Sequence, residues 1–246
     1  MAALEHMLHT ISYMGLPLLL AIVLHEYAHG WAADKCGDTT ARLQGRLTLN
    51  PLAHVDLFGT IILPLICMLL PGSFLLGWAK PVPVDPRNMA HPRRDMALVA
   101  AAGPAMNLIL AVSSALVLLL LFLVDPTVTV RDSLQSSTPR DSAATMFLVP
   151  IAAMAFYSVM INVFLALFNL IPIPPLDGGR ILTCLLPAKP ALALVRLEPY
   201  GMLILVGLIA FDKELRVIHT ITSTFAAGLS GSILSTVLGF GTGATE

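Results

Sequence analysis

The feature that most constrains this chain is a pentapeptide with ionisable side chains inside an apolar segment. His25-Glu26-Tyr27-Ala28-His29 lies near the end of the apolar run Ile11–Ala33. Ionisable groups are costly in such a run, and a buried metal site is one of the few arrangements that justify them. Two histidines four residues apart project from one face of a helix, so their ring nitrogens can converge on one zinc ion. Glu26 can then reach a water on the metal without being a ligand. The alternative is a set of polar residues at a helix end, hydrogen-bonded to neighbours or to lipid headgroups.

Composition assigns the chain to the membrane proteins. Of its 246 residues, 57% are hydrophobic and only 12% are charged, against about 25% charged residues in an average soluble domain. The net charge is -1 and no Lys/Arg-rich run is present, so we expect no nucleic-acid binding. Three scattered cysteines are too few for a disulfide framework or for a cysteine-based zinc site.

Three apolar stretches exceed the roughly 20 residues that a membrane-spanning helix needs, namely 8–33, 95–124 and 143–169. Two weaker stretches, 197–211 and 217–240, predict accessory helices of which one or both cross. Phe58–Trp78 is also apolar, but Pro64 and the Pro71-Gly72 pair break it, which predicts a re-entrant hairpin rather than a span.

These elements predict an all-α integral membrane protein. We expect one polytopic helical bundle over residues 1–246, with a three-helix catalytic core at about 8–186 and accessory C-terminal helices at about 190–240. Lys80–Val84 alternates proline with valine. Because proline is confined to edge strands, this segment predicts either a short β segment that could clamp a substrate or a rigid connector.

The basic residues predict the orientation of the bundle. Seven of them lie between the first and second spans, so this segment faces the cytoplasm by the positive-inside rule: Lys35, Arg42, Arg46, Lys80, Arg87, Arg93 and Arg94. The amino terminus is then outside, and Asp125–Ser142 forms an external loop. We therefore expect a multi-pass protein of the cell membrane with its active site toward the cytoplasmic side.

A second constellation, Asn169-Leu170-Ile171-Pro172-Ile173-Pro174-Pro175-Leu176-Asp177-Gly178-Gly179-Arg180, follows the third span. Its three prolines cannot continue a helix, so we expect extended backbone that faces a cavity. Asp177 would complete His25 and His29 into a three-ligand zinc site with an open fourth position, the pattern of catalytic zinc. Its alternative role is the N-cap of a helix over Arg180–Leu186.

With these motifs the chain resembles the site-2 proteases, intramembrane zinc metalloproteases. The two constellations match that family's two hallmark motifs, and three further stretches match as well: Leu47–Thr60, Gly77–Val84 and the Gly-Pro-x-x-Asn signature Gly103–Asn107. The resemblance implies one zinc per chain with ligands His25, His29 and Asp177, Glu26 as general base, and Asn107 in contact with substrate or its oxyanion. The resemblance is to a short form of the family, without an inserted peptide-binding domain or an appended nucleotide-sensing domain.

Two polar residues have alternatives that the sequence leaves open. Asn107 could donate its amide hydrogens to an oxyanion, but an asparagine in a membrane helix is often only an interhelical hydrogen-bonding group. His54 fits a structural role better than that of a fourth ligand, since zinc already has its three protein ligands.

We therefore predict a zinc-dependent intramembrane endopeptidase that hydrolyses a peptide bond in or near the transmembrane segment of a membrane protein. Its partners would be that substrate and the lipid bilayer. The alternative is a zinc-handling transporter or sensor with the same ligands, although transport has no need of Glu26. A catalytically inactive scaffold is a third class, which the complete set of ligands and base disfavours.

Overall fold

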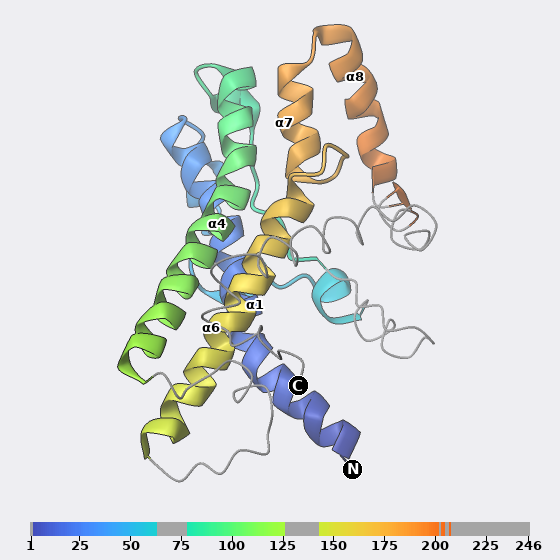
Figure 1. Cartoon of the computed structure of the whole chain (residues 1–246). Helices are drawn as coiled ribbons and strands as arrows, with labels where there is room; N and C mark the ends of the chain where they lie inside the picture. Colours follow the sequence, from blue (N-terminus) through green and yellow to red (C-terminus); the bar gives the residue numbers. More distant parts are fainter. Residues whose placement is uncertain (1, 63–77, 126–142, 202, 205–206, 208–246) are drawn as a thin grey trace, which may run out of the picture. The chain divides into compact units, whose positions relative to one another are not determined.

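A computed structural model of the chain describes residues 2–62, 78–125, 143–201, 203–204 and 207 (Figure 1). The chain divides into two compact units, which we describe separately. The site unit comprises Leu19–Asn107 and Asn169–Glu198, and the helical unit comprises Met1–Leu18, Leu108–Phe168 and Pro199–Glu246.

Most of the described residues are helical, as the sequence predicts, and they contain no strand. The longer helices are α1 (Ala2–Lys35), α4 (Pro92–Val124), α6 (Ala143–Asn169), α7 (Asp177–Leu185) and α8 (Ala188–Leu197). The short ones are α2 (Thr40–Leu43), η1 (Pro51–His54), η2 (Leu57–Ile62), η3 (Pro86–Asn88) and η4 (Glu198–Tyr200). Helices are therefore present at all three predicted spans. The short β segment predicted at Lys80–Val84 is not observed, since that segment is neither helix nor strand.

Helix α1 ends in a glycine-dependent cap. Gly37 has a φ of 103°, a left-handed conformation that glycine adopts without the steric cost of a Cβ. The Asp38 N–H donates to the Ala33 carbonyl at 2.9 Å, and the Gly37 N–H donates to Asp34 O at 3.2 Å. This pair of bonds is the Schellman motif, which ends the helix at Lys35, less than two turns after His29, and turns the chain back.

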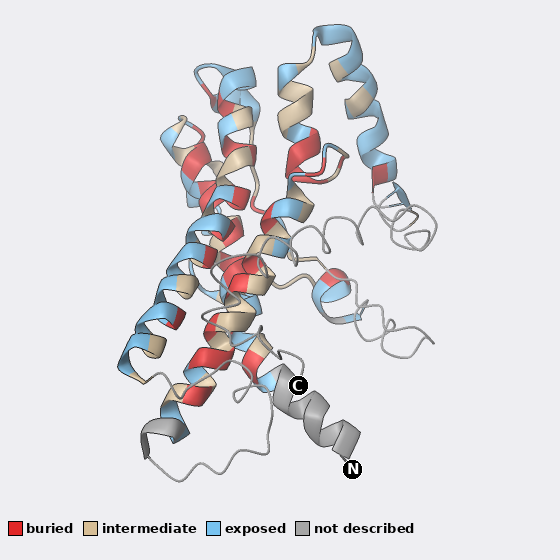
Figure 2. Cartoon of the chain, in the orientation of Figure 1, coloured by how far each residue is buried: buried red, intermediate tan, exposed pale blue. Residues whose placement is uncertain are grey.

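Small apolar side chains form the core of the site unit. Ala32 and Ala33 of α1 pack with Met89 and with Val99 of α4. Alanines at this contact let two helix backbones approach closely, which is the usual way in which helices pack in membranes. Figure 2 shows buried residues on both α1 and the first half of α4.

In the helical unit, the second half of α4 packs against α6. Leu118 of α4 lies in one buried cluster with Val149, Ala152, Ala155 and Val159 of α6. A Ser114 Oγ–Ser158 Oγ hydrogen bond of 2.7 Å joins the same two helices. Polar pairs of this kind contribute roughly 0.5–2 kcal/mol to helix association within a membrane.

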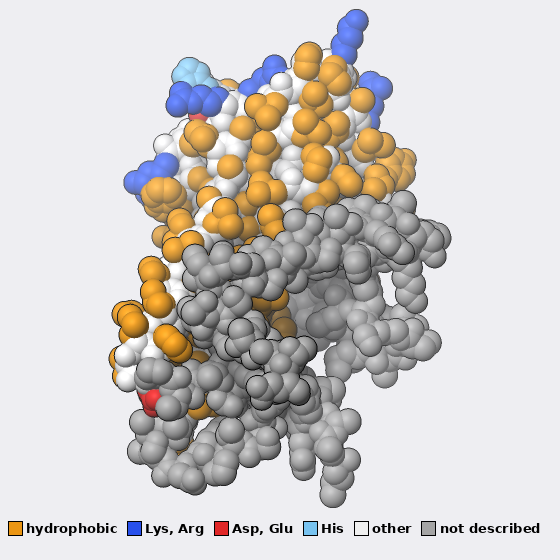
Figure 3. Space-filling model, viewed as in Figure 1, with side chains coloured by type: hydrophobic (Ala, Val, Ile, Leu, Met, Phe, Trp, Pro, Cys, Tyr) orange, Lys and Arg blue, Asp and Glu red, His pale blue; other side chains and the backbone are white. Residues whose placement is uncertain are grey.

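Length and composition would allow two of the described helices to cross a membrane, Pro92–Val124 and Met146–Asn169. Figure 3 shows hydrophobic side chains over much of the described surface, with Lys and Arg side chains gathered at one end of the site unit.

The second constellation folds differently from our prediction. Helix α6 does end at Asn169, where the prolines begin, but residues 170–176 form tight turns instead of the extended backbone we expected. Ile173 N–H donates to Ile171 O at 2.8 Å, and Leu176 N–H donates to Ile173 O at 3.0 Å. The turns fold the segment back over the start of α7. Most of the predicted hairpin, the external loop and the accessory helices lie outside the described residues.

A buried carboxylate ties the end of α1 to the segment that precedes α4. Asp38 is fully buried. Its Oδ1 accepts hydrogen bonds from the Thr40 N–H, the Thr40 hydroxyl and Asn88 Nδ2, and its Oδ2 accepts from the Asp85 N–H at 2.6 Å. Burial alone would raise the pKa of Asp38, but these hydrogen bonds outweigh it and lower the pKa below its ordinary value.

We expect Asp38→Asn to lower the free energy of unfolding by about 2 kcal/mol at neutral pH, because an amide cannot accept all of these hydrogen bonds. The folded-state pKa of Asp38 is depressed, so its contribution is fully present above the unfolded pKa of about 4 and is lost as the pH falls through the lower folded pKa. Denaturant titration of both proteins in detergent, at pH 7 and at about pH 3, measures this. An equal difference in stability at both pH values would contradict it.

Candidate metal centre

Helix α1 presents both histidines to the interior of the site unit. His25 and His29 are one helical turn apart and buried, with 8% and 7% of their surfaces exposed. Their rings lie edge to face, with centroids 4.7 Å apart. The prediction that histidines four residues apart project from one face of the helix is therefore confirmed, with both Nε2 atoms on the same side of α1.

Helix α4 crosses this face of α1 in the antiparallel direction and supports both rings. The Nδ1 of His29 lies 2.7 Å from the Val99 carbonyl, and the Nδ1 of His25 lies 2.6 Å from Asn107 Oδ1. Asn107 Nδ2 also donates to the Ala21 carbonyl, one turn before His25, at 3.4 Å. Positions 99, 103 and 107 of α4 thus follow the same four-residue period as the residues they meet on α1.

Gly103 leaves room for the rings at the centre of this crossing. A Cβ at position 103 would lie 2.4 Å from His29 Nε2 and 2.6 Å from His25 Cε1. Such distances are far inside van der Waals contact, so any larger residue would displace the histidines. The sequence marks Gly103 only as part of a short signature. The matched spacing of 99, 103 and 107 is the signal that could have shown its role.

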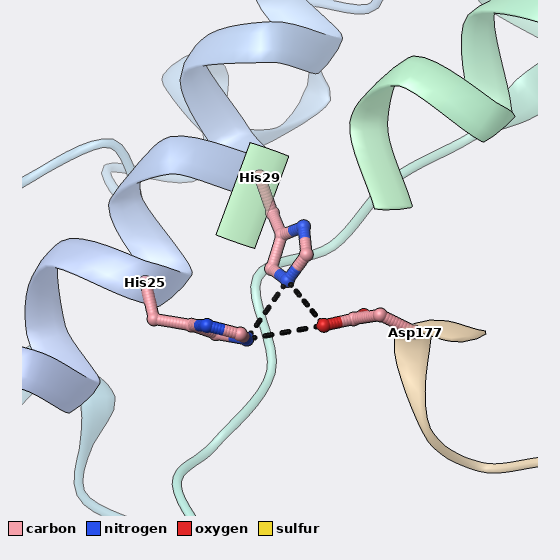
Figure 4. Close-up of side chains that lie close together, drawn as sticks. All are labelled: His25, His29 and Asp177. Carbon is pink, nitrogen blue, oxygen red and sulfur yellow. Dashed lines mark hydrogen bonds and ion pairs between the residues drawn. The ribbon is translucent and has the colours of Figure 1, made fainter. Parts of the chain in front are cut away.

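Asp177 reaches the histidines from the first turn of α7 (Figure 4). Leu176 holds the N-cap position, so the alternative role considered for Asp177, that of an N-cap, is wrong. The next two residues are buried against the turns before α7. A Cβ on Gly178 would lie 2.2 Å from Leu170 O, and one on Gly179 would lie 2.5 Å from Pro174 N. Glycine is therefore required for the loop to fold tightly enough to deliver the carboxylate.

Three ligand atoms converge as a metal site requires. His25 Nε2 lies 3.1 Å from His29 Nε2, and Asp177 Oδ2 lies 3.2 Å from the first and 3.3 Å from the second. Ligands bound tetrahedrally at zinc distances of roughly 2.0–2.1 Å stand about 3.3 Å apart. These residues therefore match the size of a zinc site.

The hydrogen bonds around the cluster also fit a cation. Both Nδ1 atoms face carbonyl-type oxygens, to which they donate in the neutral ring, so both Nε2 atoms present lone pairs to the centre. Among the described residues, no hydrogen-bond donor reaches the buried Asp177 Oδ2. Lone pairs and an unpaired carboxylate oxygen would repel one another there, and a bound cation removes that cost.

Glu26 lies beside the cluster but outside it. The described residues that could hold a metal together are His25, His29 and Asp177, and Glu26 is not among them. Its Oε2 accepts a hydrogen bond of 2.9 Å from the backbone N–H of Val82. Nothing in the sequence predicted that contact, because it joins residues 56 positions apart.

Two other predicted residues occupy defined places. Asn107 is fully buried and its amide oxygen faces His25, so the structure brings it to the rear of a ligand ring. His54 is buried, and its Nε2 lies 2.9 Å from the Thr48 carbonyl. It does not belong to the cluster of ligand atoms that the described residues form, in keeping with the structural role preferred for it.

The family assignment follows from a family model. The model for peptidase family M50 matches residues 13–210, which include every residue of the cluster. The chain belongs to peptidase family M50, the site-2 protease family. The resemblance found in the sequence motifs is thereby confirmed, and it makes the chain a metalloprotease by family.

Curated relatives carry related names. The chain is 38% identical to "Putative zinc metalloprotease YwhC" of Bacillus subtilis over 204 residues. This match covers 82% of this chain and 81% of that protein. The chain is 32% identical over 205 residues to "Putative zinc metalloprotease Rip2" of Mycolicibacterium smegmatis, covering 81% and 69% of the two chains. No solved structure matches the chain.

Gly103→Ala should weaken zinc binding by about 10- to 100-fold although no ligand is removed, because the new methyl group displaces both rings from their supports on α4. Zinc content after dialysis against a graded chelator measures this. Gly15→Ala is the matched control, since a Cβ at Gly15 meets nothing within 4 Å. Wild-type affinity in the Gly103 variant would show that the rings do not need this space.

Proposed function

We propose that this protein is a zinc-dependent intramembrane endopeptidase that cleaves membrane proteins in or near a transmembrane segment. The observation that carries the proposal is the convergence of three buried ligand atoms, 3.1–3.3 Å apart, with a carboxylate beside them that is not one of the three. Three protein ligands with an open fourth position are the pattern of hydrolytic zinc enzymes.

The chain's own residues divide the work of hydrolysis. His25, His29 and Asp177 would hold one zinc ion, which supplies Lewis acidity at the scissile carbonyl when bound. Glu26 takes the proton from the attacking water on its carboxylate and returns it to the nitrogen of the leaving amine. Its hydrogen bond from Val82 N–H fixes one carboxylate oxygen and leaves the other for proton transfer.

In this scheme Asn107 orients the ring of His25. Its bond to His25 Nδ1 holds the ring in the orientation and tautomer that a metal ligand needs. Contact with a substrate oxyanion, which the family resemblance suggested, would require this amide to leave His25. The geometry therefore favours the orienting role.

The surroundings of the site support the proposal of a membrane protein substrate. Helix α4, which supports both histidines, is one of the helices apolar enough to span a membrane, and the basic residues gather at one end of the site unit (Figure 3). By the positive-inside rule that end faces the cytoplasm, so we propose a multi-pass cell-membrane protein with its active site toward the cytoplasmic side. A substrate must unwind there, because the carbonyls of a helix are hydrogen-bonded and screened.

Zinc transport or sensing is the alternative function. The same ligands could pass or register metal, but neither task uses a carboxylate placed beside the ligands and held by a backbone amide. The position of Glu26 therefore favours proteolysis.

Glu26→Gln should leave zinc bound and reduce the rate of cleavage by about 10²–10⁴-fold or more, because proton transfer is lost while the ligands remain. The assay incubates purified protein with single-span peptides, with and without a zinc chelator, and identifies products by mass spectrometry. Wild-type cleavage that the chelator does not affect would refute the zinc mechanism. A Glu26→Gln variant as fast as the wild type would refute the general-base assignment.

Asp177→Ala should lower both zinc occupancy and activity, since it removes one of three protein ligands. If Asp177 served only the start of α7, its loss would cost about 1 kcal/mol of stability and leave zinc bound. Thr183→Ala is the control, because the Thr183 hydroxyl donates only within α7, to Gly179 O at 2.8 Å. Full zinc content in a folded Asp177→Ala protein would remove Asp177 from the ligand set.

A further inference from the structure

One peptide group stands between the proposed general base and a distant arginine. The N–H of the Pro81–Val82 peptide donates to Glu26 Oε2 at 2.9 Å, and its carbonyl accepts a hydrogen bond from Arg46 Nη2 at 3.2 Å. The same Nη2 donates to the Lys80 carbonyl at 2.8 Å. Arg46 and Glu26 therefore bind opposite ends of one rigid, planar peptide group.

Arg46 is itself held from the other side. Its Nη1 donates to the carbonyl of Ala53, the third residue of η1. The adjacent His54 carbonyl accepts a hydrogen bond of 2.9 Å from the Lys80 N–H. The planar fork of a guanidinium suits this task, since two nitrogens bond two backbone segments at once with little loss of rotational freedom.

The segment around Val82 has few ways to move. Pro81 and Pro83 restrict their own backbone angles and lack an N–H. The Val82 side chain is buried, and a Cβ on Gly30, one turn after Glu26, would lie 3.0 Å from Val82 Cγ1. Val82 thus contacts α1 at two successive turns: its side chain lies against Gly30, and its N–H donates to Glu26.

From this geometry we infer that Arg46 is a positioning residue for Glu26, acting through the Pro81–Val82 peptide. The inference rests on the proposed role of Glu26 as general base. Arg46 sets where the Val82 N–H points, and that N–H sets the orientation of the Glu26 carboxylate. A positive donor on the peptide carbonyl also polarises the group and makes its N–H a stronger donor.

The first test is hydrogen exchange in the zinc-loaded full chain, read on the peptide over residues 79–85. Its prolines carry no exchangeable amide hydrogen, so few amides contribute. We expect Arg46→Gln to raise exchange at Val82 about tenfold, while the peptides of α1 and α4 stay unchanged. Arg42→Gln is the matched control, because the Arg42 guanidinium pairs with Asp34 of α1.

A double-mutant cycle read by exchange shows whether the effect passes through Glu26. Glu26→Gln should by itself raise exchange at Val82, because an amide oxygen is a weaker acceptor than a carboxylate. Adding Arg46→Gln should then raise it by less than in the wild-type background, since both groups act on one peptide. Additive effects would show that Arg46 and Glu26 act independently and would overturn the inference.

Kinetics supply the second test. Arg46→Gln should lower kcat by about 10- to 100-fold with KM and zinc content within about twofold of wild type, because a misplaced base slows the chemical step and not binding. Arg46→Lys should recover part of kcat, since an ammonium can replace some of the hydrogen bonds, and it replaces Arg46→Gln if that variant does not fold. Loss of zinc with exchange rising throughout the site unit would show a merely structural role and overturn the inference. If wild type cleaves no peptide, the proposed function fails, while the exchange cycle still decides whether Arg46 positions Glu26.

Discussion

The arrangement of this protein depends on the cost of burying lone pairs without a counter-charge. Two imidazole Nε2 atoms and a carboxylate oxygen lie within 3.3 Å of one another inside the site unit. Without a cation these groups repel, and their burial removes the water that would otherwise screen them. The hydrogen bonds behind the histidines hold the repelling atoms in place. The site is therefore preorganised to bind a metal ion.

The supporting contacts come mostly from backbone groups and from the absence of side chains. A carbonyl of α4 holds His29, Gly103 makes room for both rings, and Gly178 and Gly179 let the turns pack against α7. In an apolar environment, backbone groups are polar atoms that the chain can present without burying further polar side chains. Glu26 is likewise held by a backbone group, the N–H of Val82.

The segment between the first two long helices has more than a connecting function. Two residues outside the metal cluster bind the backbone just before η3: Asp38 accepts a hydrogen bond from the Asp85 N–H, and Arg46 donates to the Lys80 and Pro81 carbonyls. These ties explain why a stretch without regular secondary structure lies in a defined position beside the proposed base. They also favour a rigid connector over the short strand, because Lys80 and Val82 already donate their amide hydrogens to His54 and Glu26.

The sequence by itself predicted the helices, the candidate ligands and the family. His25 and His29 are close because of local helical geometry, and apolar runs of sufficient length predict helices whatever their partners. Only the tertiary structure decided that Asp177 starts α7, that the proline segment turns tightly, and that Asn107 supports His25. It alone showed the contacts of Val82, Asp38 and Arg46. Each of these joins residues far apart in the chain, and spacing along a sequence encodes neighbours within one element but not the meeting of two.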